Sequence, residues 1–251
     1  MQNLRHPEIL ELVRKGGKVS VEGLAAHFGV TFQTIRRDLS ELAEAGHLHR
    51  VHGGAVVPSG IHNIAYAERR ALNASSKAAI GRACAKIIPD GASVFLNIGT
   101  TTEAVADALS AHDALFVVTN NLNVAQRLTA HQGSEVVVTG GQLRKEDGGL
   151  VGQGAVASVR DYRLDFAVVG CSALDPTGDM LDFDMAEVAV SRTILAQARR
   201  TILVADHSKF QRIAPCRIAS VAELDMIVTD VPLSASLRQA CEGNSTEVVI
   251  A

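Results

Sequence analysis

From Lys77 to its end, the chain alternates between short apolar runs and amphipathic segments. The apolar runs lack the polar alternation of a strand with one face in water, so each predicts a strand buried on both faces. Strands of this kind, interleaved with helices, predict an α/β fold with a parallel sheet. The predicted strands are ASVFLNIG, ALFVVTN, EVVVTGG, LDFAVVG, RTILVAD, LDMIVTD and TEVVI, and the predicted helices are TTTEAVADALSAH, NLNVAQRLTAH and MAEVAVSRTILAQA.

Polar residues and glycines follow several of these predicted strands, as in NIGTTT, TNN, TGGQLR, GCS and ADHSK. In a parallel sheet, ligands bind at the carboxyl ends of the strands. The loop IGTTT leads from a strand into a helix, so its backbone N–H groups, its hydroxyls and the helix dipole all suit an anion. We expect a phosphate there; the alternative is an ordinary capped turn.

Other polar residues could complete a site for a phosphorylated ligand. Lys209 could add a charge and Arg144 a planar fork for the phosphate, while Asn120 and Asp206 could bind hydroxyls. Lys209 could instead be a solvated loop residue. The segment AERRALNASSK carries Arg69, Arg70 and Lys77, which could reach the same anion or remain solvated on a helix. The candidate effector-binding residues are Gly99, Thr100, Thr101, Asn120, Gly141, Arg144, Asp206, Lys209 and Lys77.

The first 57 residues predict a different structure, a helix-turn-helix. RHPEILELVRKGGKVS predicts a helix that ends at Gly16 and Gly17. VSVEGLAAHFGV predicts a second helix, with Ser20 as its N-cap and Gly29 at its end. Thr31 would then cap a third helix, in the stretch VTFQTIRRDL.

The third predicted helix has one apolar face and one polar face. At 3.6 residues per turn, Ile35, Leu39 and Leu42 lie on one side with Phe32 beside them. The other side carries groups that can bind base edges and phosphates, since Gln pairs with adenine and Arg with guanine. The alternative is a solvated surface helix in which the arginines pair with acidic neighbours, Asp38 or Glu41. The residues of the polar face are Gln33, Thr34, Arg36, Arg37 and Ser40.

The segment HLHRVHGGAVV follows, with two short extended runs around Gly53 and Gly54. This pattern predicts a β-hairpin, which after a helix-turn-helix would be a wing. His49, Arg50 and His52 would lie along it, where they could contact phosphates or only solvate the turn. The candidate DNA-binding residues are Thr31, Gln33, Thr34, Arg36, Arg37, Ser40, Arg50 and His52.

Charge and cysteines limit the other function classes. The formal charge of the chain is −3, but residues 1–57 contain 7 Lys+Arg and 6 Asp+Glu, leaving 24 − 7 = 17 and 27 − 6 = 21 for the rest. This mild asymmetry suggests two domains with different partners. The four cysteines have no C-x-x-C or zinc spacing, so we expect reduced thiols and neither a metal nor a cofactor. No signal peptide or membrane span is evident, which predicts a cytoplasmic protein without a membrane partner.

R-x3-I-x3-V from Arg5 to Val13, TFQTIRRDL seventeen residues later, and HGGA together resemble the DeoR family of bacterial transcription regulators. The resemblance implies a sensor domain similar to sugar-phosphate isomerases. NIGTTTEAVADAL, VTNNLNVA, GGQLRKEDGGLVG and LVADHSKF resemble the members that repress glycerol 3-phosphate genes, with glycerol 3-phosphate as inducer. That likeness extends to about Asp230.

Other functions remain open at this point. The effector could be a different phosphorylated sugar, and an activator fits as well as a repressor. A phosphosugar isomerase would need a general base. Asp182, Asp184 and Glu187 are available, but no spacing marks one of them, so we expect no catalytic residue and no enzyme.

The predicted organisation is therefore a DNA-binding domain at 1–57, a linker and connecting segment at 58–75 that begins in VPSGIHN, and an effector-sensing domain at 76–251. One recognition helix reads few bases, so we expect a homodimer or homotetramer on a double-stranded DNA operator with repeated half-sites.

Overall fold

The computed structural model describes residues 5–16, 18–44, 47–51, 53–56, 66–243 and 245–251. The chain divides into two compact units, residues 1–61 with 211–213 and residues 62–210 with 214–251. The predicted linker VPSGIHN lies wholly outside the described residues. Residues 66–75 of the predicted connecting segment belong to the second unit, and the predicted domain limits stay predictions.

The first unit is a winged helix-turn-helix, as predicted. Ser20 caps the second helix by accepting a hydrogen bond from the Gly23 amide at 2.9 Å, and Gly29 ends it at φ 62°. Thr31 Oγ1 accepts from the Thr34 amide at 3.2 Å, which confirms the predicted cap of the third helix. The elements are α1 (His6–Gly16), β1 (Lys18–Ser20), α2 (Val21–Phe28), α3 (Phe32–Glu44), β2 (His49–Val51) and β3 (Gly54–Val56).

The strands β2 and β3 form the predicted hairpin, and β1 adds to it in the antiparallel order β1-β3-β2. The sequence did not predict β1, because three residues after a Gly pair carry no strand pattern. Gly54 has a steric reason to be glycine: a Cβ atom there would lie 2.0 Å from the carbonyl oxygen of Val19. The close approach of β1 to β3 therefore requires a residue without a side chain.

The three helices of this unit enclose a small core that includes Ile9, Leu24, Ile35 and Leu39. The predicted place of Phe32 beside this core is wrong, because 54% of its surface is exposed. It is the first residue of α3 and precedes the turns that pack on the core.

The second unit is built on a seven-stranded sheet in the order β15-β14-β12-β9-β4-β5-β6, and every pairing in it is parallel. All seven predicted strands and all three predicted helices are confirmed. The strands are β4 (Ser93–Leu96), β5 (Leu115–Thr119), β6 (Ser134–Val138), β9 (Leu164–Val169), β12 (Ala198–Val204), β14 (Met226–Thr229) and β15 (Glu247–Ile250). The helices are α4 (Tyr66–Ala71), α5 (Ala74–Ala85), α6 (Thr100–Leu109), α7 (Leu122–Leu128), α8 (Gln153–Arg160), α9 (Met185–Ala196) and α10 (Ala235–Glu242).

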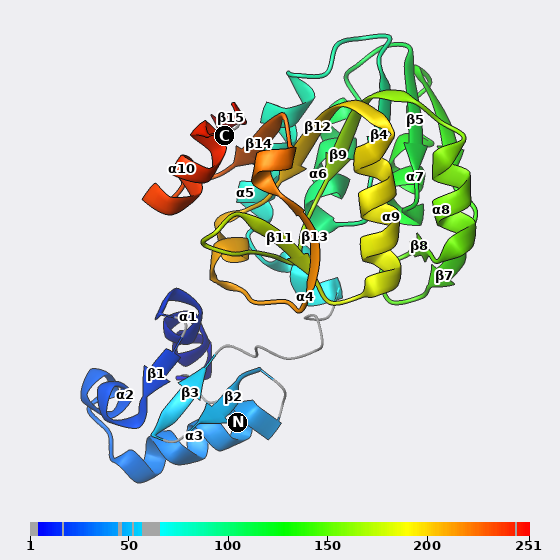
Figure 1. Ribbon diagram of the computed structural model, residues 1–251. Helices are drawn as coiled ribbons and strands as arrows, with labels where there is room; N and C mark the ends of the chain where they lie inside the picture. The colour runs from blue at the N-terminus through cyan, green and yellow to red at the C-terminus, as the bar shows by residue number, and fades with distance from the viewer. Residues whose placement is uncertain (1–4, 17, 45–46, 52, 57–65, 244) are drawn as a thin grey trace. The chain divides into compact units, whose positions relative to one another are not determined.

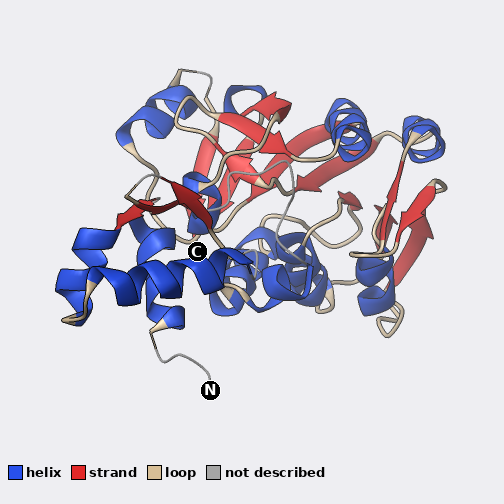
Figure 2. Ribbon diagram, turned by 90° about the horizontal axis from the view of Figure 1, so that it is seen from below, coloured by secondary structure: helices blue, strands red, loops and turns tan. Residues whose placement is uncertain are grey.

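Both faces of this sheet are buried, which explains why its strands read as continuous apolar runs. Phe166 and Val168 of β9 pack in one core with α5, α6 and α7, while Ala167 and Val169 pack in another with α8 and α9. The strands thus lie between two helical layers (Figures 1 and 2). None of the helices among the described residues is long and apolar enough to cross a membrane.

Two smaller sheets were not predicted. One is the hairpin β7 (Gln142–Arg144) and β8 (Gly149–Val151), and the other joins β10 (Ala173–Leu174), β11 (Asp179–Asp182) and β13 (Cys216–Ser220). Their strands are too short to show a period in the sequence. Short 3-10 turns at His207–Gln211 and Val221–Glu223 complete the chain.

The packing of α5 on α6 gives a first test of the fold. A Cβ atom on Gly81 would lie 2.4 Å from the carbonyl oxygen of Ala104, so we expect Gly81→Ala to destabilise the second unit by about 1–3 kcal/mol. Gly243→Ala is the matched control, because the nearest atom lies at 3.5 Å and its φ of −61° suits alanine. Thermal unfolding of both variants checks this, and equal midpoints would contradict the close packing.

Candidate functional site

The outward face of α3 carries the predicted DNA-binding side chains. Gln33, Arg36 and Arg37 are exposed. Arg37, whose side chain is 82% exposed, pairs with Glu41 at 2.9 Å, one of the two partners that the solvated-surface alternative proposed. An exposed pair four residues apart contributes only about 0.3–0.5 kcal/mol, so it leaves Arg37 available to a stronger partner.

The wing lies against this face. Arg50 of β2 donates to Ser40 Oγ of α3 at 2.7 Å, and Ser40 Oγ donates to the carbonyl oxygen of Arg36 at 2.9 Å. The predicted set therefore contributes a continuous polar surface from helix and wing. The His49 side chain and the whole of His52 lie outside the described residues.

The middle of α3 is held by an ion pair that the sequence did not predict. Asp38, which is buried, accepts from Arg5 Nε at 2.8 Å and from Arg5 Nη2 at 3.3 Å. Asp38 thus joins α3 to Arg5, the residue just before α1.

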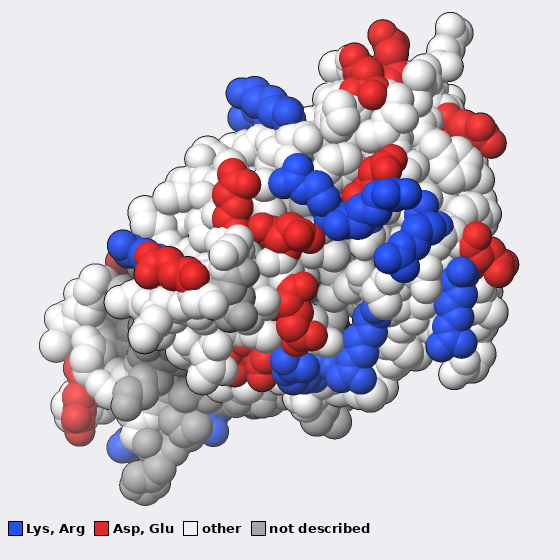
Figure 3. Space-filling model, turned by 45° about the horizontal axis from the view of Figure 1, so that its top comes forward, with Lys and Arg blue, Asp and Glu red and all other residues white. Residues whose placement is uncertain are grey.

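Basic and acidic side chains are mixed over the face of the molecule in Figure 3. The overall charge of −3 likewise gives no extended positive field. Attraction to a polyanion would therefore depend on the local groups of α3 and the wing.

In the second unit, the predicted anion loop lies at the end of β4. Gly99 precedes α6 with φ 150°, and among the described residues no side chain caps this helix. Thr102 Oγ1 donates to the carbonyl oxygens of Asn97 and Gly99, both at 2.7 Å, which fixes the loop from inside. Thr101 is buried and Thr100 half-buried, with Thr100 Oγ1 3.5 Å from the carbonyl oxygen of Arg69. The amino end of α6 thus keeps its N–H groups for a ligand.

Several buried polar atoms at this carboxyl edge lack a hydrogen-bond partner among the described residues. Buried polar groups are almost always paired, so unpaired ones indicate water or a ligand. Asn120 and Asp206 are among the predicted effector-binding residues, whereas Asn121 and Thr139 are not, although TNN and TGG mark the same strand ends. The atoms at the strand ends are Asn120 Oδ1, Asn121 Nδ2, Thr139 Oγ1, Asp206 Oδ2 and Thr229 Oγ1, and Arg69 Nε on α4 is unpaired as well.

Asp206 links the end of β12 to the segment between α4 and α5. Its Oδ1 accepts from Asn73 Nδ2 at 2.8 Å and from Ser208 Oγ at 2.6 Å. Burial opposes its ionisation, but the charges of Lys209 and Lys77 and these hydrogen bonds outweigh burial and hold the pKa of Asp206 below its ordinary value. Asp206 is therefore an anion at neutral pH, able to accept hydrogen bonds from ligand hydroxyls through Oδ2.

Lys77 lies in the same region but performs a task that the sequence did not predict. It is 4% exposed, and its ammonium donates to the carbonyl oxygens of Arg69 and, at 2.6 Å, of Leu72. These groups lie at the carboxyl end of α4, so Lys77 fixes that helix to α5. Arg70, in contrast, is exposed.

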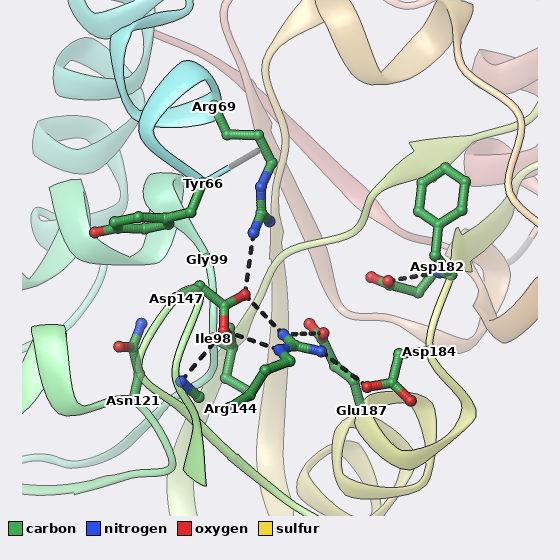
Figure 4. Close-up of polar contacts among 12 residues, drawn as sticks. Tyr66, Arg69, Ile98, Gly99, Asn121, Arg144, Asp147, Asp182, Asp184 and Glu187 are labelled. Atoms are coloured by element: carbon green, nitrogen blue, oxygen red, sulfur yellow. Dashed lines mark hydrogen bonds and ion pairs between the residues drawn. The ribbon is translucent and has the colours of Figure 1, made fainter. Parts of the chain in front are cut away.

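Arg144 is engaged with carboxylates rather than presented to an anion. It bonds Asp147 at 2.8 and 2.9 Å, Asp184 at 2.9 Å and Glu187 at 2.6 Å, and Asp147 also accepts from Arg69 at 3.0 Å (Figure 4). Burial opposes ionisation of Asp147, but Arg144 and Arg69 hold its pKa below its usual value. The predicted phosphate fork thus has another role here, joining the β7–β8 hairpin to α9 and α4.

Asp182 is a further buried carboxylate of this region, and its charge acts on Glu187. Burial, and for Glu187 the charge of Asp182, raise the pKa of each above its ordinary value. Asp182 also accepts from the Phe183 amide at 2.6 Å. The region as a whole carries more acidic than basic groups, which disfavours a phosphate beside Arg144 and favours the α6 loop.

Tyr66 of α4 contacts the first turn of α6 through a network missed in the sequence. Its hydroxyl donates to Glu103 at 2.9 Å and accepts from Asn123 at 3.0 Å, while Arg127 donates to Glu103 at 3.2 Å. Burial and the charge of Glu103 raise the pKa of Tyr66. A lone tyrosine in a segment taken for a connector gave no signal that could have found it.

Of the other predicted effector residues, Gly141 is constrained by packing, whereas the charge of Lys209 acts on Asp206. Gly141 has φ 129°, and a Cβ atom there would lie 2.9 Å from both the carbonyl oxygen of Val151 and Ala155 Cβ. Lys209 is buried, and its amide donates to the carbonyl oxygen of Asp206 at 3.0 Å. Their roles as effector ligands stay predictions.

Residues 5–60 match the family described as the DeoR-like helix-turn-helix domain, and residues 72–231 match the DeoR C terminal sensor domain. The chain belongs to the DeoR family. It is 44% identical over 238 residues to the glycerol-3-phosphate regulon repressor of Escherichia coli (strain K12), which covers 95% of this chain and 94% of that one. It is 46% identical over 232 residues to the protein of the same name from Haemophilus influenzae, covering 92% and 91% of the two chains.

Both relatives are named as regulon repressors, and the first unit of this DeoR-family chain matches a helix-turn-helix domain. Among solved structures the chain is similar to ribose 5-phosphate isomerase A from Methanocaldococcus jannaschii, with a TM-score of 0.41, 14% identity and 55% of each chain covered.

Proposed function

We propose that this chain represses genes of glycerol 3-phosphate metabolism by binding their operators, and that glycerol 3-phosphate releases it. The observation that carries the proposal is 44% identity, over 95% of the chain, to a repressor named for the glycerol-3-phosphate regulon. The identity extends across both units, so it applies to the DNA-binding helix and the sensor together.

The geometry of the first unit supports the DNA-binding step. The residues Gln33, Arg36 and Arg37 are exposed on α3, and the wing adds Arg50 beside them. Such a helix can enter the major groove while the wing contacts phosphates. The operator is double-stranded DNA, and a homodimer or homotetramer would supply two such helices.

The geometry of the second unit supports the release step. The amino end of α6 offers N–H groups to a phosphate, and unpaired polar atoms of Asn120 and Asp206 lie just after β5 and β12, at the same carboxyl edge of the sheet. Glycerol 3-phosphate has a phosphate anion that suits the N–H groups of α6, and two hydroxyls that can hydrogen-bond to Asn120 and Asp206. Such a sensor would act in the cytoplasm, where bacterial DNA lies.

No observation favours the isomerase alternative. Asp184 and Glu187 are bound to Arg144, and a winged helix has no part in isomerisation. A different phosphorylated sugar is the alternative effector, and an activating role the alternative sign of regulation.

A gel shift tests the whole proposal. Duplexes from promoters next to the gene for this chain are titrated with the full-length protein, with and without glycerol 3-phosphate. We expect tight binding without the ligand and release with it. Binding that glycerol 3-phosphate leaves unchanged, and that another phosphorylated sugar abolishes, would replace the proposed effector.

Thermal unfolding of the full chain tests the phosphate site separately. At a ligand concentration 100 times Kd, binding adds about 2.7 kcal/mol, so we expect glycerol 3-phosphate to raise the unfolding midpoint of the second unit by about 5–10 °C. Glycerol should have far less effect, because it lacks the group that the α6 loop binds. Equal shifts with glycerol and glycerol 3-phosphate would exclude that loop as the phosphate site.

A further inference from the structure

Phe32 is an exposed aromatic residue on the helix that we assign to the major groove. Single exposed apolar residues are ordinary on protein surfaces, so exposure alone says little. The place of Phe32 is the informative feature, because it is the first residue of α3. The later apolar residues of this helix, Ile35, Leu39 and Leu42, are buried.

The neighbours of Phe32 are the predicted base-reading residues. Gln33 follows it directly, and Arg36 lies one turn later on the same side of the helix, and both are exposed. Side chains in a helix tilt toward its amino end, so the Phe32 ring projects ahead of the first turn. Recognition helices contact bases with their amino-terminal residues.

A base pair presents one apolar group in the major groove, the C5 methyl of thymine. Gln and Arg side chains read hydrogen-bonding groups and gain nothing from a methyl, whereas an aromatic ring can cover it. We propose that Phe32 packs against a thymine methyl and so adds thymine to the bases that α3 distinguishes. The inference rests on the proposed function, since it requires α3 in the major groove.

The test uses deoxyuridine, which lacks the methyl of thymine and keeps the same base pairing. A duplex that the full-length protein selects from a random pool is resynthesised with each thymine replaced singly. Removing one methyl contact should lower the affinity of the parent protein about fourfold at one position in each half-site. Phe32→Ala should bind the original thymine duplex about fourfold more weakly than the parent does. Replacing thymine by uracil at that position should not lower the affinity of Phe32→Ala any further.

The difference between thymine and uracil is measured within each variant, so a general loss of affinity does not obscure it. Met185→Ala is the control, because Met185 is similarly exposed, at 56%, but lies on α9 of the second unit. Met185→Ala should lose affinity at the same uracil positions, and by the same factors, as the parent protein. Equal losses in the parent and in Phe32→Ala at every uracil would overturn the inference. A parent protein that selects no duplex would instead refute the proposed function.

Discussion

Replacing Gln33 and Arg37 together by alanine should weaken operator binding by about 100-fold, while the thermal unfolding midpoint stays unchanged. Each bidentate base contact is worth about 1–3 kcal/mol, so losing two reaches this range. Both side chains are exposed, and the only described partner of Arg37 is the exposed Glu41, so the folded first unit loses little. Gel shifts at fixed salt measure the affinity.

Salt dependence separates two roles for Arg37. If it holds a phosphate, Arg37→Ala should weaken all sequences alike and reduce the salt slope by about one unit. If it reads a base, the loss should depend on the sequence. Arg199→Ala removes the same charge from β12, where the side chain is 71% exposed, and serves as the control. It should change neither the operator affinity nor the salt slope. Unchanged affinity of the double variant would disprove the assignment of α3.

The sequence predicted the fold of both units where local signals were strong. Ser20, Gly29 and Thr31 have the cap geometry that their residue types favour, and the apolar runs became parallel strands because both faces of the sheet are covered. It failed on β1 and on the β7–β8 hairpin, whose strands have three residues each and exist through long-range pairing. Phe32 was misplaced because helical projection says nothing about where a core ends.

The candidate sensor site was only partly predictable. The loop at Gly99 and the end of β12 at Asp206 follow from the rule that parallel strands bind ligands at their carboxyl ends. The role of Arg144 does not follow, because two of its three carboxylate partners, Asp184 and Glu187, lie about forty residues further along the chain. Likewise, a sequence cannot show that the Lys77 ammonium lies on two carbonyl oxygens of α4.

The contacts of α4 suggest how a ligand in the sensor could influence the first unit. Helix α4 is the first described element of the second unit in chain order, so it is one route by which a signal could pass along the chain toward the first unit. Lys77 binds the carbonyl oxygens of Arg69 and Leu72 at its end, and its charge also acts on Asp206. The Lys77 side chain therefore bonds to the end of α4 and also acts electrostatically on Asp206 in the predicted ligand region. An inducer needs such a link, because it must favour one arrangement of the protein over the other.

Lys77→Ala should accordingly leave operator binding without ligand intact, but raise the glycerol 3-phosphate concentration needed for release by about tenfold, which corresponds to about 1.4 kcal/mol of lost coupling. Lys86→Ala, at the exposed end of the same helix, removes the same charge and should behave as the parent. Operator affinity at rising glycerol 3-phosphate is measured for all three proteins, after thermal unfolding has shown that each is folded.

The ligand-induced rise of the unfolding midpoint then separates two causes of weaker release. If glycerol 3-phosphate raises the unfolding midpoint of Lys77→Ala as it does that of the parent, but releases the variant from the operator less readily, Lys77 transmits the signal. If the midpoint no longer rises, Lys77 binds the phosphate. Coinciding release curves would show that α4 does not carry the signal, which would then pass through an interface between subunits.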